Sequence, residues 1–183
     1  PSTSQTFTIA VTNVNDYPVT AVTDTNADTE VLAEDAAIGS LAGITAHASD
    51  ADTGAVVTYS LSDNAGGKFA INSTTGVVTL ASALDYETAA SHTITVRALS
   101  SDGSVNSQDF TINVNNLNDN AVTAVSDSNG ATNTVAENAA VGAVVGLTAL
   151  ASDADTGAVV TYSLSDNAGG KFAINSSTGV VTV

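Results

Sequence analysis

The sequence is poor in several residue types, and each shortage excludes a class of protein. It contains no cysteine, which excludes disulfides, zinc–thiolate sites and thiol catalysis. Lys and Arg total 3 against 19 Asp and Glu, which gives a formal net charge of −16 at pH 7. We therefore expect no nucleic-acid partner and no anionic membrane surface, because both are bound through cationic side chains. Such an acidic chain suits cations instead.

Long hydrophobic runs and aromatic residues are also scarce. The longest apolar run, 139–151, is shorter than the roughly 20 residues of a membrane-spanning helix, so we expect no membrane insertion in this segment. Aromatics make up 4% of the chain and hydrophobic residues 43%, which predicts a mainly aliphatic core. The few aromatics also disfavour a carbohydrate- or protein-binding module. Pro1, with no preceding Met, suggests an internal segment of a longer protein.

An internal repeat organises the rest of the sequence. An offset of 103 residues places Asp16 on Asp119, and it makes Ala48–Ser73 identical to Ala151–Ser176. We read residues 1–15 as the final strand of a preceding repeat, 16–118 as a complete repeat and 119–183 as a truncated repeat. A period of this length fits an independently folding domain better than a solenoid unit.

The local pattern predicts β-strands. Apolar and polar residues alternate at 7–11, 57–61, 94–98 and 110–114, as in half-buried strands. Turn residues separate these segments at 52–54, 64–67, 73–76 and 102–103, and we expect 82–90 to be a loop. Short strands with turns every 8–12 residues predict an all-β fold of tandem immunoglobulin-like Greek-key sandwiches.

Acidic motifs recur at fixed places in this unit. Glu34 follows the first strands, Asp50 and Asp52 form an Asp-x-Asp, and Leu84-Asp85-Tyr86-Glu87 precedes a later strand. Asp102 opens a late hairpin, and Asn116-Leu117-Asn118-Asp119-Asn120 lies at the seam between the repeats. In order and spacing this set resembles cadherin repeats, and the near-identical units resemble the bacterial cadherin-like repeats of giant surface adhesins.

The resemblance implies calcium bound between successive repeats. The seam would take side chains of Glu34, Asp85, Glu87, Asn118, Asp119, Asp153 and Asp155, with backbone carbonyls of Leu117 and Asn120. Asn15, Asp16, Asp50 and Asp52 would complete a site with a preceding repeat, and Glu137 would face a following one. Calcium takes six to eight oxygen ligands of these kinds.

The sequence departs from the family pattern at three places. The first linker position is Asn13 or Asn116 in place of Asp, and the first linker ends in Tyr17. The late Ala-x-Asp motif reads Ala98-Leu99-Ser100, so one carboxylate is absent and Asp102 is its candidate substitute. We expect two calcium ions per seam more readily than three.

Other site types fit the sequence less well. A single Asp-x-Asp is usually a solvated turn, but the ordered set favours calcium. Asp50-Ala51-Asp52-Thr53-Gly54 has its glycine one position too early for an EF-hand. No Ser/His/Asp set is plausible, and His92 is expected to be an exposed strand residue, so we do not expect an enzyme.

Two functions follow from this interpretation. The first is a calcium-rigidified extender in a large bacterial cell-surface or secreted adhesion or biofilm protein, located outside the cell, whose partners are neighbouring repeats of the same chain. The alternative is a building block of a self-assembling extracellular filament or surface layer, in which other copies of the chain are partners through strand donation.

Overall fold

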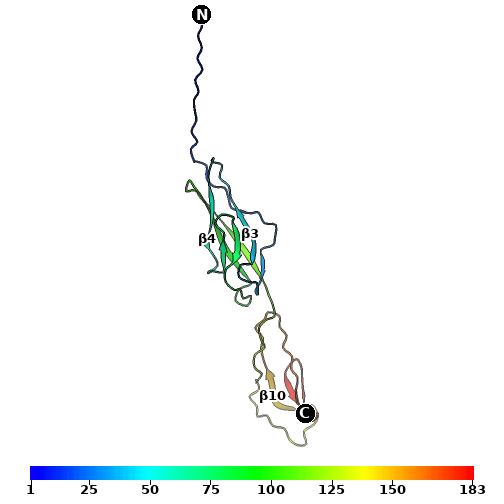
Figure 1. Ribbon diagram of the computed structural model, residues 1–183. Coiled ribbons are helices and arrows are strands. Elements are labelled where there is room, and N and C mark those ends of the chain that lie inside the picture. Colours follow the sequence, from blue (N-terminus) through cyan, green and yellow to red (C-terminus); the bar gives the residue numbers. More distant parts are fainter. The chain divides into compact units, whose positions relative to one another are not determined.

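The computed structural model describes all residues, 1–183, and divides them into two units (Figure 1). Unit 1 comprises Pro1–Asn115 and unit 2 comprises Asn116–Val183. Both are built from β-strands and loops, and no helix could cross a membrane. The predicted all-β class is confirmed.

Unit 1 is a sandwich of two four-stranded sheets. Its strands are β1 (Thr23–Asp24), β2 (Val31–Ala33), β3 (Leu41–His47), β4 (Val57–Asp63), β5 (Phe69–Ile71), β6 (Val77–Leu80), β7 (Ser91–Ser100) and β8 (Val105–Asn115). One sheet has the order β1-β3-β6-β5 and the other β2-β8-β7-β4. All pairs are antiparallel except β2 with β8, which run parallel in the register Val31 to Asn113 and Ala33 to Asn115. This is the predicted immunoglobulin-like sandwich.

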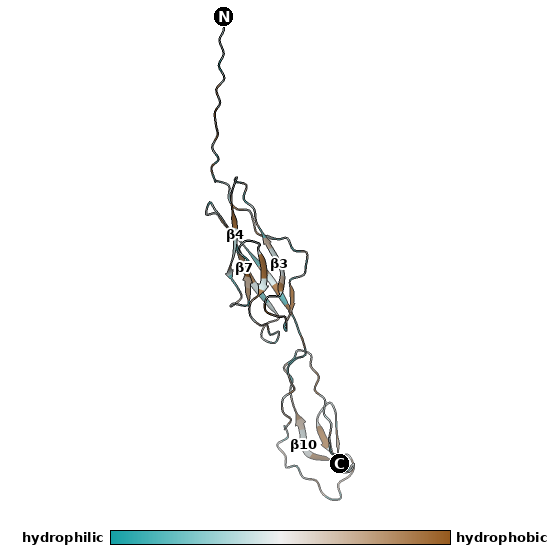
Figure 2. Cartoon of the chain, in the orientation of Figure 1, coloured by the Kyte–Doolittle hydropathy of each residue, from teal (hydrophilic) through white to brown (hydrophobic).

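The core of unit 1 lies between the two sheets. The largest fully buried side chains come from both: Ile44, Val78 and Leu80 from the first sheet, and Ile94, Val96 and Ile112 from the second. Figure 2 shows the hydrophobic colour along β3 and β7. Each such side chain contributes about 1.5–3 kcal/mol by leaving water, so an aliphatic core compensates for the scarcity of aromatics.

Unit 2 contains the counterpart of the first sheet alone. Its strands are β9 (Ser126–Asp127), β10 (Val144–Leu150), β11 (Ala173–Ile174) and β12 (Val180–Thr182), in the order β11-β12-β10-β9. This order matches β5-β6-β3-β1 of unit 1 at the 103-residue offset. Within residues 116–183 no strand corresponds to β2, β4, β7 or β8 of the second sheet.

Residues 7–11 pair with no strand within residues 1–183, and Phe7, Ile9 and Val11 are 78%, 87% and 93% exposed, because β8 occupies the equivalent place in unit 1. Their assignment as the final strand of a preceding repeat stays a prediction. One local prediction was wrong: His92 is half-buried, because it shares the inward face of β7 with Ile94. The predicted loop at 82–90 and the four predicted turns are confirmed.

Candidate metal centre

Three carboxylates meet at the end of unit 1 where the chain leaves it. Glu34, Asp85 and Glu87, here called the C-terminal cluster, each offer an oxygen within 4.8 Å of the others. The parallel β2–β8 pair positions Glu34, whose N–H donates to the carbonyl of Asn115 at 3.2 Å. The Glu34 side chain is buried, and its Oε2 accepts the N–H of Tyr86 at 2.7 Å. That hydrogen bond ties the Leu-Asp-Tyr-Glu loop to the end of β2.

A local turn holds Asp85 as an ionised group. Its Oδ1 accepts the N–H of Thr88 at 3.1 Å, and its Oδ2 accepts the Thr88 hydroxyl at 2.7 Å. The side-chain and backbone hydrogen bonds from Thr88 lower the pKa of Asp85 below its usual value. The carboxylate is therefore charged and oriented before any ligand arrives.

A second set of carboxylates meets at the opposite end of unit 1. Asp50, Asp52 and Asp102, here called the N-terminal cluster, each offer an oxygen within 4.8 Å of the others. Asp50 and Asp52 lie in the loop between β3 and β4, and Asp102 lies in the turn between β7 and β8. The pairing of Val57 with Ser100 brings these two loops together. The structure thus places Asp102 beside the Asp-x-Asp, where the sequence lacks the expected carboxylate.

The incoming chain is fastened to the N-terminal cluster. The N–H of Tyr17 donates to Asp52 Oδ2 at 2.7 Å, and the Asn15 amide, in the orientation that satisfies both of its neighbours, donates to the same oxygen at 2.9 Å. The Asn15 amide oxygen accepts the N–H of Asp102 at 3.2 Å. Asp16 lies between these two residues and is exposed. The Asn15 side chain therefore contacts Asp52 and Asp102, two of the three members of the N-terminal cluster.

Neighbouring hydroxyl groups complete this cluster. The buried Ser100 hydroxyl donates to Asp50 Oδ2. The side chain and N–H of Ser104 lower the pKa of Asp102, and the N–H bond to Oδ1 is 2.7 Å. Neither serine was predicted to orient the carboxylates, although Ser100 stands where the family motif has an acid. Thr88 was not predicted either, although its N–H and its hydroxyl both donate to the Asp85 carboxylate.

Unit 2 repeats the arrangement around Asp155. The N–H of Asn120 donates to Asp155 Oδ2 at 2.9 Å, as the N–H of Tyr17 does to Asp52 at the equivalent position. The Asn120 side chain and the N–H of Asp119 donate to Oδ1 at 2.9 and 3.3 Å. Burial opposes ionisation of Asp155, but the hydrogen bonds from Asn120 and Asp119 outweigh it and lower the pKa. Asp153 Oδ1 accepts the Asp155 N–H at 3.1 Å.

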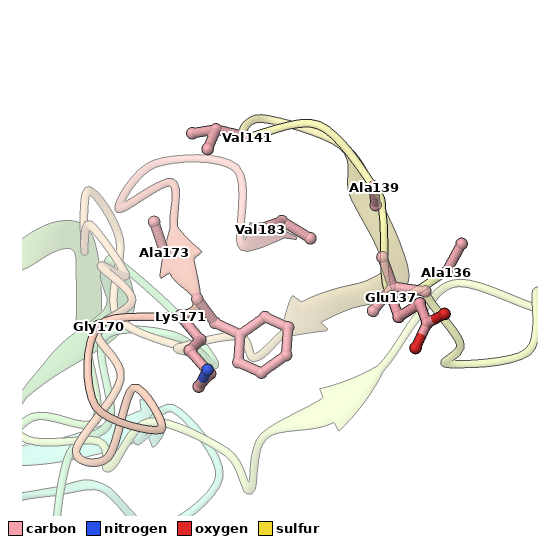
Figure 3. Close-up of a pocket in the computed structure, with 10 residues that line it drawn as sticks. Ala136, Glu137, Ala139, Val141, Gly170, Lys171, Ala173 and Val183 are labelled. Carbon is pink, nitrogen blue, oxygen red and sulfur yellow. The ribbon is translucent and has the colours of Figure 1, made fainter.

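The remaining predicted ligands have no cluster within their own unit. Leu117 and Asn118 lie in the exposed segment that precedes Asp119. Glu137, the counterpart of buried Glu34, is exposed and lines a cavity of about 490 Å³ with Lys171 and Val183 (Figure 3). Within residues 116–183, Glu137 belongs to no group of carboxylates that could hold a metal ion.

The chemistry of these donors fits a hard divalent cation. Each unit-1 cluster contains three carboxylates, with no histidine or cysteine ligand. Hydrogen bonds occupy part of the oxygen lone pairs and fix the orientation of the others. Oxygen-only donor sets of this kind suit calcium, whose flexible coordination tolerates irregular geometry.

Comparison with known proteins identifies the fold. Residues 28–115 match the family model for the cadherin domain. The chain is 38% identical over 158 residues to human protocadherin Fat 4, which covers 82% of this chain and 3% of that protein. Residues 28–115 are therefore a cadherin domain. The identity of Ala48–Ser73 and Ala151–Ser176 extends the resemblance into unit 2.

Solved structures agree with this identification. The structure of mouse cadherin-23 EC22-24 has a TM-score of 0.76 and 31% identity, covering 94% of this chain and 55% of that chain. The extracellular cadherin domains 1-4 of protocadherin gamma B7 give a TM-score of 0.73 and 26% identity, covering 93% of this chain and 42% of that chain. The sequence comparisons give human and mouse relatives, so the predicted bacterial origin has no support from them.

Proposed function

We propose that this chain is a calcium-binding, non-enzymatic extender segment of an extracellular adhesion protein. The observation that carries the proposal is the presence of an acidic cluster at each end of unit 1. Asp85 and Glu87 precede the start of β7, and Asp102 follows its end. A strand of 10 residues is about 33 Å long, so the two clusters are separate sites.

The repeat suggests how the clusters are used. Two units in tandem bring the C-terminal cluster of one and the N-terminal cluster of the next toward one joint. The chain from residue 115 to residue 120 reaches no more than about 18 Å, which is short enough to keep the two ligand sets close. At this joint we propose two sets of side chains as calcium ligands. Repeat 16–118 supplies Glu34, Asp85 and Glu87, and repeat 119–183 supplies Asp153 and Asp155.

The linker supplies the other proposed ligands. Asn118 and Asp119 contribute side chains, and Leu117 and Asn120 contribute backbone carbonyls. The set at the chain's start (Asn15, Asp16, Asp50, Asp52 and Asp102) takes calcium with a preceding repeat, and Glu137 takes it with a following one. Without calcium the carboxylates repel one another and the joint bends freely. With calcium the units hold a fixed angle, which extends the protein away from the cell.

Calcium titration with scattering tests this function. Isothermal titration of chelator-treated protein should give calcium binding, and small-angle scattering should give a larger maximum dimension in calcium than in EDTA. Glu34→Gln and Asp155→Asn should weaken binding. Asp28→Asn is the matched control, because Asp28 is exposed and belongs to neither cluster. Absence of calcium binding, or a maximum dimension that EDTA leaves unchanged, would rule out the proposal.

A second proposal is a building block of a filament or surface layer. It is favoured by residues 7–11, whose exposed Phe7, Ile9 and Val11 correspond to Phe110, Ile112 and Val114 of β8. Ile112 and Val114 are buried in unit 1, so a strand of this sequence is able to bury its apolar face. Electron microscopy of concentrated protein in calcium tests this function: dispersed particles at every concentration exclude it.

A further inference from the structure

One surface turn has the same polar motif in both units. Asn72-Ser73-Thr74 follows β5, and Asn175-Ser176-Ser177 follows β11 at the equivalent position. These are the two asparagines of the sequence that have a serine or threonine two residues later. Asn-x-Ser/Thr is the acceptor motif for N-linked glycans, and it must lie on a surface loop to carry one.

The structure presents both asparagines on the surface. Asn72 Oδ1 accepts the N–H groups of Thr74 and Thr75, each at 3.0 Å. Asn175 Oδ1 accepts those of Ser177 and Thr178 at 3.0 and 2.9 Å. Both side chains are exposed, and their Nδ2 atoms donate no hydrogen bond within their units. The amide oxygen is thus fixed by the turn, and the nitrogen is left for solvent.

The backbone holds this turn without help from the hydroxyl groups. The N–H of Asn72 donates to Val77 O and the N–H of Gly76 donates to Asn72 O, both at 2.9 Å. The same two bonds recur at 2.9 Å from Asn175 to Val180 and from Gly179 to Asn175. The Thr74 and Ser177 hydroxyls are exposed and take no part in these bonds. The hydroxyl two residues after each asparagine is therefore not needed by the fold.

We propose that Asn72 and Asn175 are acceptors for N-linked glycans when the chain enters a secretory pathway, an inference that rests on the proposed extracellular location. The donor is an oligosaccharide joined through its first sugar to a lipid diphosphate. The asparagine Nδ2 forms a bond to C1 of that sugar and loses a proton to a base of the transferase. The C1–oxygen bond to the diphosphate breaks, and the diphosphate leaves with the bonding electrons.

The position of the sites gives the glycans a physical role. Asn72 directly follows β5, an edge strand of its sheet, and Asn175 directly follows the edge strand β11. Exposed edge strands offer unpaired N–H and C=O groups to other strands. In tandem units of near-identical sequence, an edge strand of one unit can pair wrongly with the equivalent edge strand of another, because the two strands have matching sequences. A bulky, hydrated glycan at the end of each edge shields it.

Expression in cultured human cells tests the proposal. The chain of residues 1–183, placed behind a secretion signal, should migrate as a shifted species that peptide N-glycosidase returns to the unmodified position. Thr74→Ala should remove one step of the shift, Ser177→Ala the other, and the double variant both. Thr74→Ser keeps the motif and should keep the shift. Mass spectrometry should find the glycans at Asn72 and Asn175 and none at Asn64, which caps a similar turn without the motif.

The gel shift and the mass spectrometry are applied both to protein secreted into the medium and to protein retained inside the cells. Chain recovered from the lumen of the secretory pathway or from the medium without a glycan at either asparagine would overturn the proposal. Glycans at other asparagines alone would overturn it as well. Calcium titration of unglycosylated protein from bacterial expression tests the proposed function separately, so failure of one is distinguishable from failure of the other.

Discussion

Asp24 in unit 1 and Asp127 in unit 2 are equivalent residues with different partners. Each accepts two backbone N–H groups through Oδ1, at 2.8 to 3.1 Å. Asp127 Oδ2 also accepts the Asn133 side chain at 3.0 Å. Unit 1 has Glu30 at the position of Asn133, and Asp24 Oδ2 is buried with no hydrogen-bond partner. One substitution between the repeats thus removes a hydrogen bond from the first of them.

Exchanging these two residues should therefore change stability in opposite directions. Glu30→Asn should raise the free energy of unfolding of unit 1 by about 1 kcal/mol, because it supplies a donor to a buried oxygen. Asn133→Glu should lower that of unit 2 by a similar amount. Hydrogen exchange at a series of urea concentrations gives the free energy of unfolding of each unit separately, and so measures both changes. If Glu30→Asn leaves the free energy of unfolding of unit 1 unchanged, then a water molecule already donates a hydrogen bond to Asp24 Oδ2.

His92 should make unit 1 sensitive to mild acid. Its ring packs edge-on against Phe69 with centroids 5.9 Å apart, and its Nε2 is buried without a partner. Burial, and then the charge of Lys68, lower the pKa of His92 below 6.5. The unfolded chain therefore binds the proton more readily, so stability should fall as the pH drops below 6.5 toward the folded-state pKa.

A pair of leucine variants separates this effect from general acid sensitivity. His92→Leu should abolish the loss of stability in that pH window, as measured by urea unfolding at a series of pH values. His47→Leu places in unit 1 the residue that unit 2 has at position 150, and it should leave the loss in place. If the free energy of unfolding of His92→Leu still falls with pH in this window, the acid sensitivity comes from other titratable groups.

At the scale of elements, strand pairing determines whether a repeated segment becomes a strand. Val57–Asp63 forms β4 and pairs with β7, whereas residues 160–166 have the same sequence and form no strand. Both copies keep one local anchor, because the Tyr59 and Tyr162 hydroxyls accept the N–H groups of Ala48 and Ala151 at 2.9 and 3.1 Å. Alternation alone does not make a strand when its ladder partner is absent.

Adding the partner should therefore convert the second copy into a strand. A chain extended after Val183 by the sequence of residues 81–118 provides counterparts of β7 and β8. Residues 160–166 should then gain amide protection in hydrogen exchange, to the level of residues 57–63. An extension with the same composition in scrambled order should give no protection. Equal exchange rates in both extended chains would contradict this explanation.

Strand pairing also determined which strands could be predicted from the sequence. Alternation located β4, β7 and β8, since each has a long antiparallel partner within unit 1. It did not locate β2, a three-residue strand held by a parallel pair that is distant in sequence. The strand that it assigned to residues 7–11 stays a prediction, because the pairing partners of that strand would belong to a preceding repeat outside residues 1–183. Pairing between segments decided each of these outcomes.

Prediction of the site had a similar limit. The spacing of acidic motifs named all six carboxylates that form the two clusters of unit 1, including Asp102 as a substitute. It could not reveal the groups that orient them, such as Thr88, Ser100 and the N–H of Tyr17. Serine, threonine and backbone amides are too common to stand out in a sequence. Their role depends on loops that the fold brings together.

At the scale of the whole molecule, repulsion between negative charges opposes folding. The net charge of −16 is spread over a chain with three cationic side chains, so in the absence of divalent ions its carboxylates repel one another. In EDTA, the midpoint of thermal unfolding should rise as sodium chloride increases from about 0.01 M to 1 M, because the screening length shortens from about 30 Å to 3 Å.

Calcium should reduce this salt dependence. Calcium bound at the proposed sites should neutralise the carboxylates that lie closest together, so less repulsion should remain to be screened. Differential scanning calorimetry in both conditions, with magnesium as the control ion, measures the effect. The same salt dependence with and without calcium would indicate that the bound ions do not relieve the repulsion.

The parallel pairing of β2 with β8 has a mechanical consequence. β8 ends at Asn115, where the chain leaves unit 1, and β2 connects back through β1 to the fastened segment at Tyr17. Tension along the polypeptide therefore pulls the two strands in opposite directions along their length. Their ladder is loaded in shear, and its hydrogen bonds resist the force together. Glu34 directly follows this ladder. An ion bound at Glu34 would therefore add resistance to mechanical unfolding at the end of unit 1 where the pulling force is applied.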